Sequence, residues 1–379
     1  MTDDAGASDS PTDEGIRDLV CLTMVHGVGP LTCQALLQRF GTATAVLNAR
    51  TAELRDVSGV GTKLADRIVK ARSEIDAVAE LDHCRKHQVA ITTRGMPSYP
   101  PPLEDIPDPP SLLYCRGTYL PGDELAIALV GSRKCTPYGL RIAGRLATSL
   151  ARVGITVVSG LARGIDAAAH DAALKAGGRT IGVLANGLAR IYPPEHEELA
   201  SAVTQAGCLI SEMPMRQGPL AGLFPQRNRL IAGLCLGVVV VEATPRSGSL
   251  STAHHAMEQN REVFAVPGPV DSLSSQGCHR LLRDGAKLVE TVDDILEELG
   301  PLVREVRPGP SEPAVRRPSE LVLSDLERSI LGRLDDRPQA VDALIGLTGM
   351  TASQVLATLS VLEMRRLVRR LPGHQFVRT

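Results

Sequence analysis

Residues 126–166 read AIALVGSRKCTPYGLRIAGRLATSLARVGITVVSGLARGID, and their pattern defines a strand, a helix and a second strand. The run 126–130 is wholly apolar, which is typical of a strand buried on both faces. A helix is predicted over residues 138–153, with Thr136 as its cap and Pro137 in its first turn. Residues 155–158 form the second apolar run. This spacing predicts two parallel strands joined by a crossover helix.

The same alternation continues downstream, with apolar runs at 180–185, 208–212, 237–243 and 262–266 and helical stretches between them. Such an order predicts an α/β domain, a Rossmann-like, doubly wound parallel sheet. Residues 80–118 have a different pattern, because prolines cluster between positions 97 and 110. That cluster predicts irregular structure lying over a neighbouring part of the chain.

Small polar residues and glycines follow each predicted strand and open the next helix. In doubly wound sheets, ligands bind at the carboxyl ends of the strands. Backbone N–H groups at the start of a helix bind anions. The pattern therefore predicts a site for the phosphate of a nucleotide or polynucleotide, formed by Gly131, Ser132, Arg133, Ser159, Gly160, Asn186, Gly187, Ser247, Gly248 and Ser249.

The segment FPQRNR at residues 224–229 indicates which phosphate compound binds. Phe224 can stack on a base while Arg227 binds a phosphate beside the Asn228 amide. The alternative is that Phe224 is a core residue preceding a helix with surface arginines, and the nearby phosphate-type turns favour binding. The first strand is followed by GSR instead of the G-x-G-x-x-G of dinucleotide sites, and the sequence has no G-x-x-x-x-G-K-[ST] loop. We expect no cofactor and no metal.

Residues 15–78 are predicted to form a small all-α domain with one motif repeated. An apolar residue, the tripeptide Gly-Val-Gly and an amphipathic helix occur twice, and this pair resembles a helix-hairpin-helix tandem. Such tandems bind the DNA backbone without regard to sequence, whereas the alternative is that these helices only pack. The secondary DNA contacts expected here are Gly27, Gly29, Gly59, Gly61 and Lys63.

The last part of the chain is predicted to be a winged-helix domain at residues 320–379. Three helical stretches precede a basic hairpin, and a proline-rich linker at residues 301–319 separates them from the central domain at 79–300. Arg365 and Arg366 are further candidates for secondary DNA contacts. Docking of a protein partner, or simple packing, is the alternative role of this domain.

Composition limits the class of protein. The chain has 379 residues, 43% of them hydrophobic and 22% charged, which suits a globular protein of two or three domains. Its net charge of −2 indicates that any nucleic-acid site is local. The 8 cysteines are scattered, and no apolar run reaches the roughly 18 residues of a membrane span. The acidic start, residues 1–14, is typical of a disordered tail, so we expect a cytoplasmic protein.

The central segment resembles the DNA processing protein A family (DprA, also called Smf). Besides LVGSR at 129–133, the resemblance is carried by VSGLARGID at 158–166 with His170, FPQRNRLIAGL at 224–234, and VFAVPG at 263–268. It implies a non-enzymatic protein that binds single-stranded DNA, protects it, and loads RecA on it during natural transformation, usually as a homodimer. It also implies a strand-binding pocket that includes Arg163 and Lys175 besides the residues above. Where the family commonly has Gly-Thr-Asn, this chain has Gly277-Cys278-His279, which puts the role of the usual asparagine in doubt.

Two enzyme interpretations are alternatives to binding. Ser159, Asp166 and His170 are the residue types of a hydrolase triad, but the last two share one helix and no G-x-S-x-G elbow is present. The second is a nucleoside-monophosphate phosphoribohydrolase, which shares the Rossmann-like build. The residues at 242–249 lack the P-G-G-x-G-T-x-x-E stretch that such enzymes use, so this alternative ranks behind DNA binding.

Overall fold

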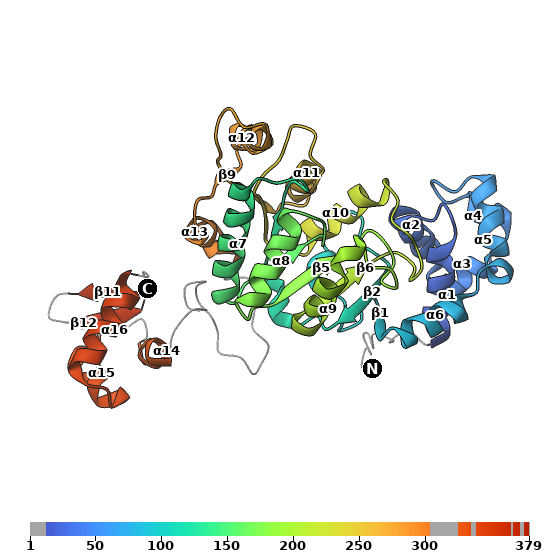
Figure 1. Ribbon diagram of the computed structural model, residues 1–379. Coiled ribbons are helices and arrows are strands. Elements are labelled where there is room, and N and C mark those ends of the chain that lie inside the picture. The colour runs from blue at the N-terminus through green and yellow to red at the C-terminus, as the bar shows by residue number, and fades with distance from the viewer. Residues whose placement is uncertain (1–12, 304–324, 335–338, 365–366, 372–374, 379) are drawn as a thin grey trace, which may run out of the picture. The chain divides into compact units, whose positions relative to one another are not determined.

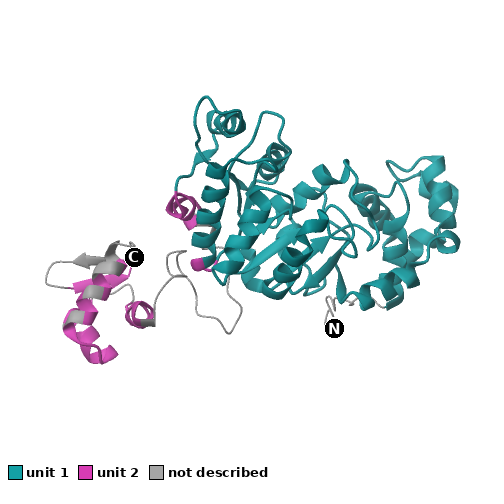
Figure 2. Cartoon of the chain, in the orientation of Figure 1, with its two compact units in different colours: residues 1–151, 155–290 teal, residues 152–154, 291–379 magenta. Residues whose placement is uncertain are grey.

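The computed structural model describes residues 13–303, 325–334, 339–364, 367–371 and 375–378 (Figure 1). It divides into two compact units, shown in Figure 2. Unit 1 comprises Met1–Ala151 and Ile155–Glu290, and unit 2 comprises Arg152–Gly154 and Thr291–Thr379. Residues 1–12 of the predicted acidic tail and most of the predicted linker lie outside the described residues, whereas Asp13 and Glu14, also assigned to the tail, begin a helix. Within the described part of the chain, no helix is both long and apolar enough to cross a membrane.

A nine-stranded sheet forms the centre of unit 1, in the order β1-β2-β6-β5-β4-β3-β7-β8-β9. Neighbouring strands from β6 to β9 are parallel, whereas β1 pairs with β2, and β2 with β6, in antiparallel fashion. This arrangement confirms the predicted doubly wound sheet. The strands are β1 (Val89–Thr93), β2 (Leu112–Gly117), β3 (Ala126–Val130), β4 (Thr156–Ser159), β5 (Thr180–Val183), β6 (Cys208–Ser211), β7 (Gly237–Val240), β8 (Glu262–Ala265) and β9 (Lys287–Leu288).

Helices cover both faces of this sheet because successive side chains of each buried strand point to opposite faces. Apolar residues of α10, α11 and α12 pack with Ala126, Ala128 and Val130 of β3 on one face. On the other face, α9 packs with Leu209 of β6. The helices are α7 (Pro137–Arg152), α8 (Ile165–Lys175), α9 (Glu197–Ala206), α10 (Leu223–Gly233), α11 (Ser249–Glu258) and α12 (Gln276–Arg283), with short 3-10 helices η1 (Pro101–Leu103), η2 (Pro121–Glu124), η3 (Pro194–His196) and η4 (Leu273–Ser275).

Residues 80–118 contain the expected irregular segment and, in addition, two strands that were not predicted. The irregular proline-rich segment is flanked by β1 and β2, whose antiparallel register pairs Val89 with Arg116 and Thr93 with Leu112. These two strands extend the parallel sheet at one edge. The sequence pattern did not reveal them because their pairing partners are separated by the long loop.

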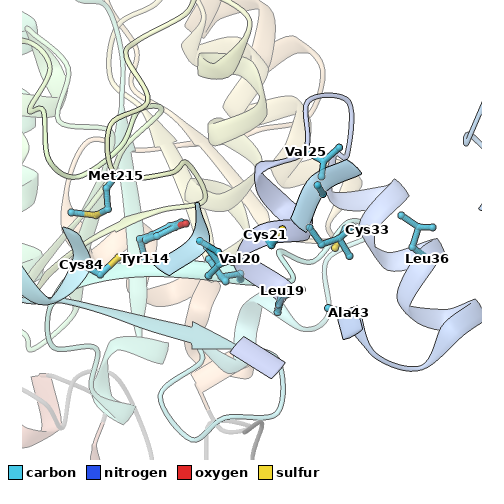
Figure 3. Close-up of a cluster of buried hydrophobic side chains, with 14 of the residues drawn as sticks. Leu19, Val20, Cys21, Val25, Cys33, Leu36, Ala43, Cys84, Tyr114 and Met215 are labelled. Carbon is cyan, nitrogen blue, oxygen red and sulfur yellow. The ribbon is translucent and has the colours of Figure 1, made fainter. Parts of the chain in front are cut away.

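The N-terminal part of unit 1 is helical, as predicted. Its helices are α1 (Asp13–Met24), α2 (Pro30–Phe40), α3 (Ala43–Asn48), α4 (Thr51–Arg55), α5 (Thr62–Glu74) and α6 (Ala77–Lys86). Its hydrophobic core continues without a break into the sheet, where Val20 and Cys84 lie in the same cluster as Tyr114 and Met215 (Figure 3). The predicted boundary at residue 78 therefore falls inside one hydrophobic core.

Unit 2 contains α13 (Val292–Val303), which runs past position 301, where the linker was expected to begin. Its other elements are α14 (Asp325–Leu331), β10 (Gln339–Ala340), α15 (Val341–Thr348), α16 (Ala352–Met364), β11 (Val368–Leu371) and β12 (Gln375–Arg378). The strands form a sheet in the order β10-β12-β11, and Ile330, Leu344, Leu359 and Phe376 lie in one core. Three helices with a small antiparallel sheet match the predicted winged helix.

Candidate nucleic-acid interface

A pocket of about 570 Å³ opens at the carboxyl ends of β3, β4 and β7, with α10 as one wall. We call it the α10 pocket. The loops after these three strands and the first turns of α10 and α11 line it. Of the residues predicted to bind a strand, it brings together Ser132, Arg133, Phe224, Arg227, Asn228, Ser247 and Gly248.

Glycine allows the loops after β3 and β4 to lie against each other. Gly164 has a φ of +77°, and a Cβ at this position would lie 2.3 Å from the Ser132 carbonyl oxygen. The next residue, Ile165, donates its backbone N–H to that same oxygen at 3.3 Å. No L-residue with a side chain fits there, because both its backbone conformation and its Cβ are disfavoured.

Glu242, which is buried just after β7, fixes the loop that carries Arg133. Its carboxylate accepts hydrogen bonds from the Thr136 backbone N–H at 2.8 Å and from the Thr136 hydroxyl at 2.5 Å. Its carbonyl oxygen accepts from the Ser132 N–H at 2.8 Å. A Cβ at Gly139 would lie 2.5 Å from the carboxylate, so α7 needs a glycine at this point. Both ends of the loop are therefore held by one residue.

Arg227 forms the floor of the α10 pocket. Its guanidinium donates to the carbonyl oxygen of Gly160 at 2.7 Å and to that of Val183, and a Cβ on Gly160 would collide with it. Burial lowers the pKa of Arg227 to about 10, so the group stays charged at neutral pH. Burial also raises the pKa of Asp166, which accepts the Gly160 N–H at 3.1 Å, while the charge of Arg227 opposes that rise. Arg227 thus holds two strand ends together.

The exposed side of the pocket combines an aromatic ring with a free cation. The Arg133 guanidinium carbon lies 4.7 Å from the centre of the Phe224 ring, and no described residue forms an ion pair with Arg133. Tyr192 meets the same ring edge-on at 6.0 Å. Lys134 adds a second exposed cation to the lining. Aromatic stacking beside positive charge is the combination that binds single-stranded nucleic acids.

The first turn of α11 also lines the pocket. Gly248 precedes the helix, its carbonyl accepts the Asn228 amide at 3.2 Å, and no atom of the described residues lies within 4 Å of a Cβ placed on it. The Ser247 and Ser249 hydroxyls are 2.7 Å apart. Open space beside these two hydroxyls, at the positive end of the α11 dipole, suits a phosphate.

The structure places the other five predicted strand-binding residues outside the lining of this pocket. Ser159 is buried and donates to the Leu129 carbonyl at 2.6 Å, and Gly160 lies beneath Arg227. Lys175 pairs with Asp171 in the last turn of α8, roughly 15 Å along the helix from the pocket end. Arg163 pairs with Glu195 at 2.5 Å.

Asn186 is the fifth of these residues. Its amide donates to the carbonyl oxygens of Gly187 and Arg190. The chain at Pro214 and Met215 covers this turn so closely that a Cβ on Gly187 would lie 2.0 Å from the Pro214 carbonyl oxygen. A strand contact by any of these five residues stays a prediction.

Sequence reasoning missed several lining residues, among them Lys134, Thr244, Ser251 and Thr252. Lys134 directly follows the GSR tripeptide, and its position was the signal available. Thr244 lies in the turn after β7, whereas Ser251 and Thr252 lie one turn into α11. Those three positions have no signal in the sequence, because the wall they form depends on the crossing of α10 and α11.

Ser159, Asp166 and His170 are not hydrogen-bonded to one another and form no hydrolase triad. Ser159 bonds to Leu129, Asp166 accepts from Gly160, and His170 Nδ1 lies 2.7 Å from the Thr180 hydroxyl. Burial lowers the pKa of His170 to about 3, so its ring is neutral.

The departure at Gly277-Cys278-His279 lies in the first turn of α12. Gly277 packs on Ala243, Cys278 is fully buried, and His279 Nε2 lies 3.0 Å from the Gly268 carbonyl oxygen. All three residues therefore make packing or hydrogen-bond contacts within the fold.

The two predicted hairpins share one backbone conformation. Gly27 and Gly59 have positive φ angles of 102° and 83°, and Gly29 and Gly61 precede α2 and α5 in extended conformation. Lys63 is exposed in the first turn of α5. Arg365 and Arg366 lie outside the described residues.

Three known family models match the same three segments of the chain. Residues 90–300 match the family model described as DNA recombination-mediator protein A. Residues 312–374 match the DprA winged helix domain, and residues 21–74 match a SAM-like helix-hairpin-helix tandem.

Curated relatives and solved structures agree with these matches. Protein Smf of Synechocystis is 34% identical over 94% of this chain and 97% of its own length. DNA processing protein DprA of Bacillus subtilis is 45% identical over 74% of this chain and 95% of its own. The crystal structure of DprA from Streptococcus pneumoniae has a TM-score of 0.62 at 33% identity, covering 74% of this chain and 95% of that one. A structure from Helicobacter pylori, described for its single-stranded DNA binding mode, has a TM-score of 0.51 at 31% identity, covering 56% and 95%.

A Rossmann-like sheet between a helix-hairpin-helix tandem and a winged helix defines a multidomain protein of the DNA-processing class. The chain belongs to the DNA recombination-mediator protein A family, whose members are called DprA or Smf.

Proposed function

We propose that this protein binds single-stranded DNA in the α10 pocket, with one base on Phe224 and phosphates at Arg133 and the start of α11. The observation that carries the proposal is the Arg133–Phe224 stack, 4.7 Å apart, at the open side of a pocket lined by helix N-termini. The Helicobacter pylori relative, described for its single-stranded DNA binding mode, supports it.

The protein acts as a carrier of the strand and not as a catalyst. It protects the incoming strand and loads RecA on it, and it works as a homodimer in the cytoplasm. The family description as a recombination mediator supports the loading role. The contact with RecA and the homodimer rest on family resemblance.

Equilibrium binding by the full chain tests this function. A labelled single strand of about 20 nucleotides exceeds the roughly 4–16 nucleotides that one such site covers. We expect the single strand to bind more tightly than a duplex of equal length at about 0.1 M salt, with affinity falling as salt rises. Equal affinity for both forms, or none for either, would overturn the proposal.

A further inference from the structure

A second cavity, of about 520 Å³, lies in unit 1 on the other side of α10. We call it the hairpin cleft. The first hairpin, from Thr23 to Pro30, forms one wall, and the segment after β6, including Glu212 and Gln217, forms another. Leu223 and Gln226 of α10 close it. The second hairpin, with Gly59 and Gly61, contributes nothing to its described lining.

The cleft and the α10 pocket share one helix as their dividing wall. Leu223 and Gln226 line the cleft, whereas Phe224 and Arg227 line the pocket. Residues three apart share a helix face, so these two pairs mark two faces of α10. The sites are therefore about one helix diameter, ~10 Å, apart. At roughly 3.4 Å per nucleotide of a stacked strand, about three nucleotides cover that distance.

The chemistry of the cleft suits a base and not a phosphate. Among the described residues that line it, none is a lysine or an arginine. Glu212 is paired with Arg229 at 2.5 Å, and Arg229 also pairs with Asp108 at 3.0 Å, so this acidic group in the lining disfavours a phosphate. Pro30 opens α2 and has no backbone N–H to offer an anion.

The rest of the cleft lining is apolar surface with a few polar groups. Met24, Val28, Met213 and Leu223 supply apolar surface, and the Gln217 and Gln226 side chains supply amides. Gln226 is exposed and makes no side-chain hydrogen bond with any described residue. Apolar surface with convergent amide donors and acceptors fits an unstacked base, whose faces are apolar and whose edges form hydrogen bonds.

We propose that the hairpin cleft is a second base-binding subsite. The strand that places one base on Phe224 places another, unstacked base in this cleft. The inference rests on the proposed function and extends it, because it makes the first hairpin part of the single-strand track. The two hairpins then differ in function although their backbones agree.

Two matched variants test the subsite. Gly29 has a φ of −91°, and a Cβ there or on Gly122 of η2 meets no atom of the described residues within 4 Å. Gly29→Phe therefore introduces a ring beside the cleft without backbone strain, and Gly122→Phe makes the same change before β3, at a position that lines neither cavity. The probes are labelled oligothymidylates, one of about 2 nucleotides, which is too short to span both sites, and one of about 12 that reaches the cleft from the α10 pocket.

We expect Gly29→Phe to weaken binding of the longer probe about tenfold and of the shorter probe less than twofold. Gly122→Phe should leave both affinities unchanged. Unchanged binding of the longer probe by Gly29→Phe, or an equal loss in both variants, would overturn the subsite while leaving the proposed function intact. If the wild-type chain bound neither probe, the proposed function itself would fail and the subsite with it.

Photo-crosslinking of the wild-type chain gives an answer that does not depend on how the variants fold. A strand carrying 5-iodouracil at each position in turn should crosslink to peptides containing His26 or Met213, both of which line the cleft. The reactive positions should lie about three nucleotides from the one that reacts near Phe224. Crosslinks confined to the α10 pocket would contradict the inference.

Discussion

At the scale of single residues, the two arginines of the α10 pocket have different tasks. Arg227 is buried and bonded to the carbonyls of Gly160 and Val183, whereas Arg133 is exposed on the Phe224 ring. A buried cation with fixed partners maintains the fold, and an exposed cation on an aromatic ring is available to a phosphate.

Substitution of the two arginines should separate these tasks. Arg227→Ala leaves two buried carbonyls without donors and should lower the free energy of unfolding by about 2–4 kcal/mol. Arg227→Lys should recover little, because an ammonium group cannot reproduce the planar guanidinium. Arg133→Ala should change stability by less than about 0.5 kcal/mol. Urea unfolding measures all three, and wild-type stability of Arg227→Ala would contradict the assignment.

His170 should make the fold sensitive to acid. Burial lowers its folded pKa from 6.5 to about 3, so the unfolded chain binds a proton that the folded chain does not. The contribution of neutral His170 to the free energy of unfolding is complete above pH 6.5. It is lost as the pH falls toward 3, at about 1.4 kcal/mol per pH unit.

In His170→Gln this pH dependence should disappear, making the loss of stability between pH 6.5 and 5 about 2 kcal/mol smaller than in the wild type. The exposed His254 gives the control, since His254→Gln should follow the wild type. Urea unfolding across this pH range is the measurement. Parallel curves for the wild type and both variants would exclude the role of His170.

The sequence could not distinguish the two arginines. The segment FPQRNR predicted both an aromatic platform and phosphate-binding arginines. The platform is present, since Phe224 faces the pocket. Both arginines of this segment are buried, and Arg227 donates to the carbonyl of Gly160, 67 residues away in the chain, so no local pattern carries that information.

At the scale of elements, the pocket depends on how closely the loop after β4 approaches the loop after β3. Gly164, just before α8, makes that approach possible, because a Cβ there would lie 2.3 Å from the Ser132 oxygen. Gly177, just after α8, has nearly the same φ, +75°, but open space around it.

The pair Gly164→Ala and Gly177→Ala isolates the effect of the close approach. Gly177→Ala should cost about 1–2 kcal/mol from backbone strain alone. Gly164→Ala adds a collision and should cost roughly 3 kcal/mol or more, with weaker strand binding because the loop carrying Arg133 is displaced. Chemical unfolding and strand binding are measured on both variants. Equal effects on both properties would show that the close approach is unimportant.

Most elements of the sheet could be predicted because each signal is local. The buried run 126–130, the Thr136 cap and Pro137 are read directly from neighbouring residues, and the Thr136 hydroxyl indeed accepts the Gly139 N–H at 3.2 Å. The antiparallel strands β1 and β2 escaped prediction because they are joined by a proline-rich loop. β2 is held by pairing with β6, which follows much later in the chain, and β1 is held by pairing with β2.

At the scale of the whole molecule, the order of its parts was visible in the sequence, but the continuity of the core was not. Apolar residues of α1 and α6 share one cluster with β2 and β6. A helical pattern shows which face of a helix is apolar and not which surface covers it. The hairpin cleft exists only because the helical part packs on this edge of the sheet.

Salt-dependent binding of labelled single-stranded DNA by the wild type, Arg133→Ala and Phe224→Ala tests the central claim most directly. Arg133→Ala should bind about tenfold more weakly, and its slope of log affinity against log salt should shrink by about 0.7, the value for one lost phosphate contact.

Phe224→Ala should lose about 1–3 kcal/mol of binding free energy from stacking while keeping a slope near that of the wild type. Wild-type affinity and slope in both variants would place the DNA outside the α10 pocket and contradict the account.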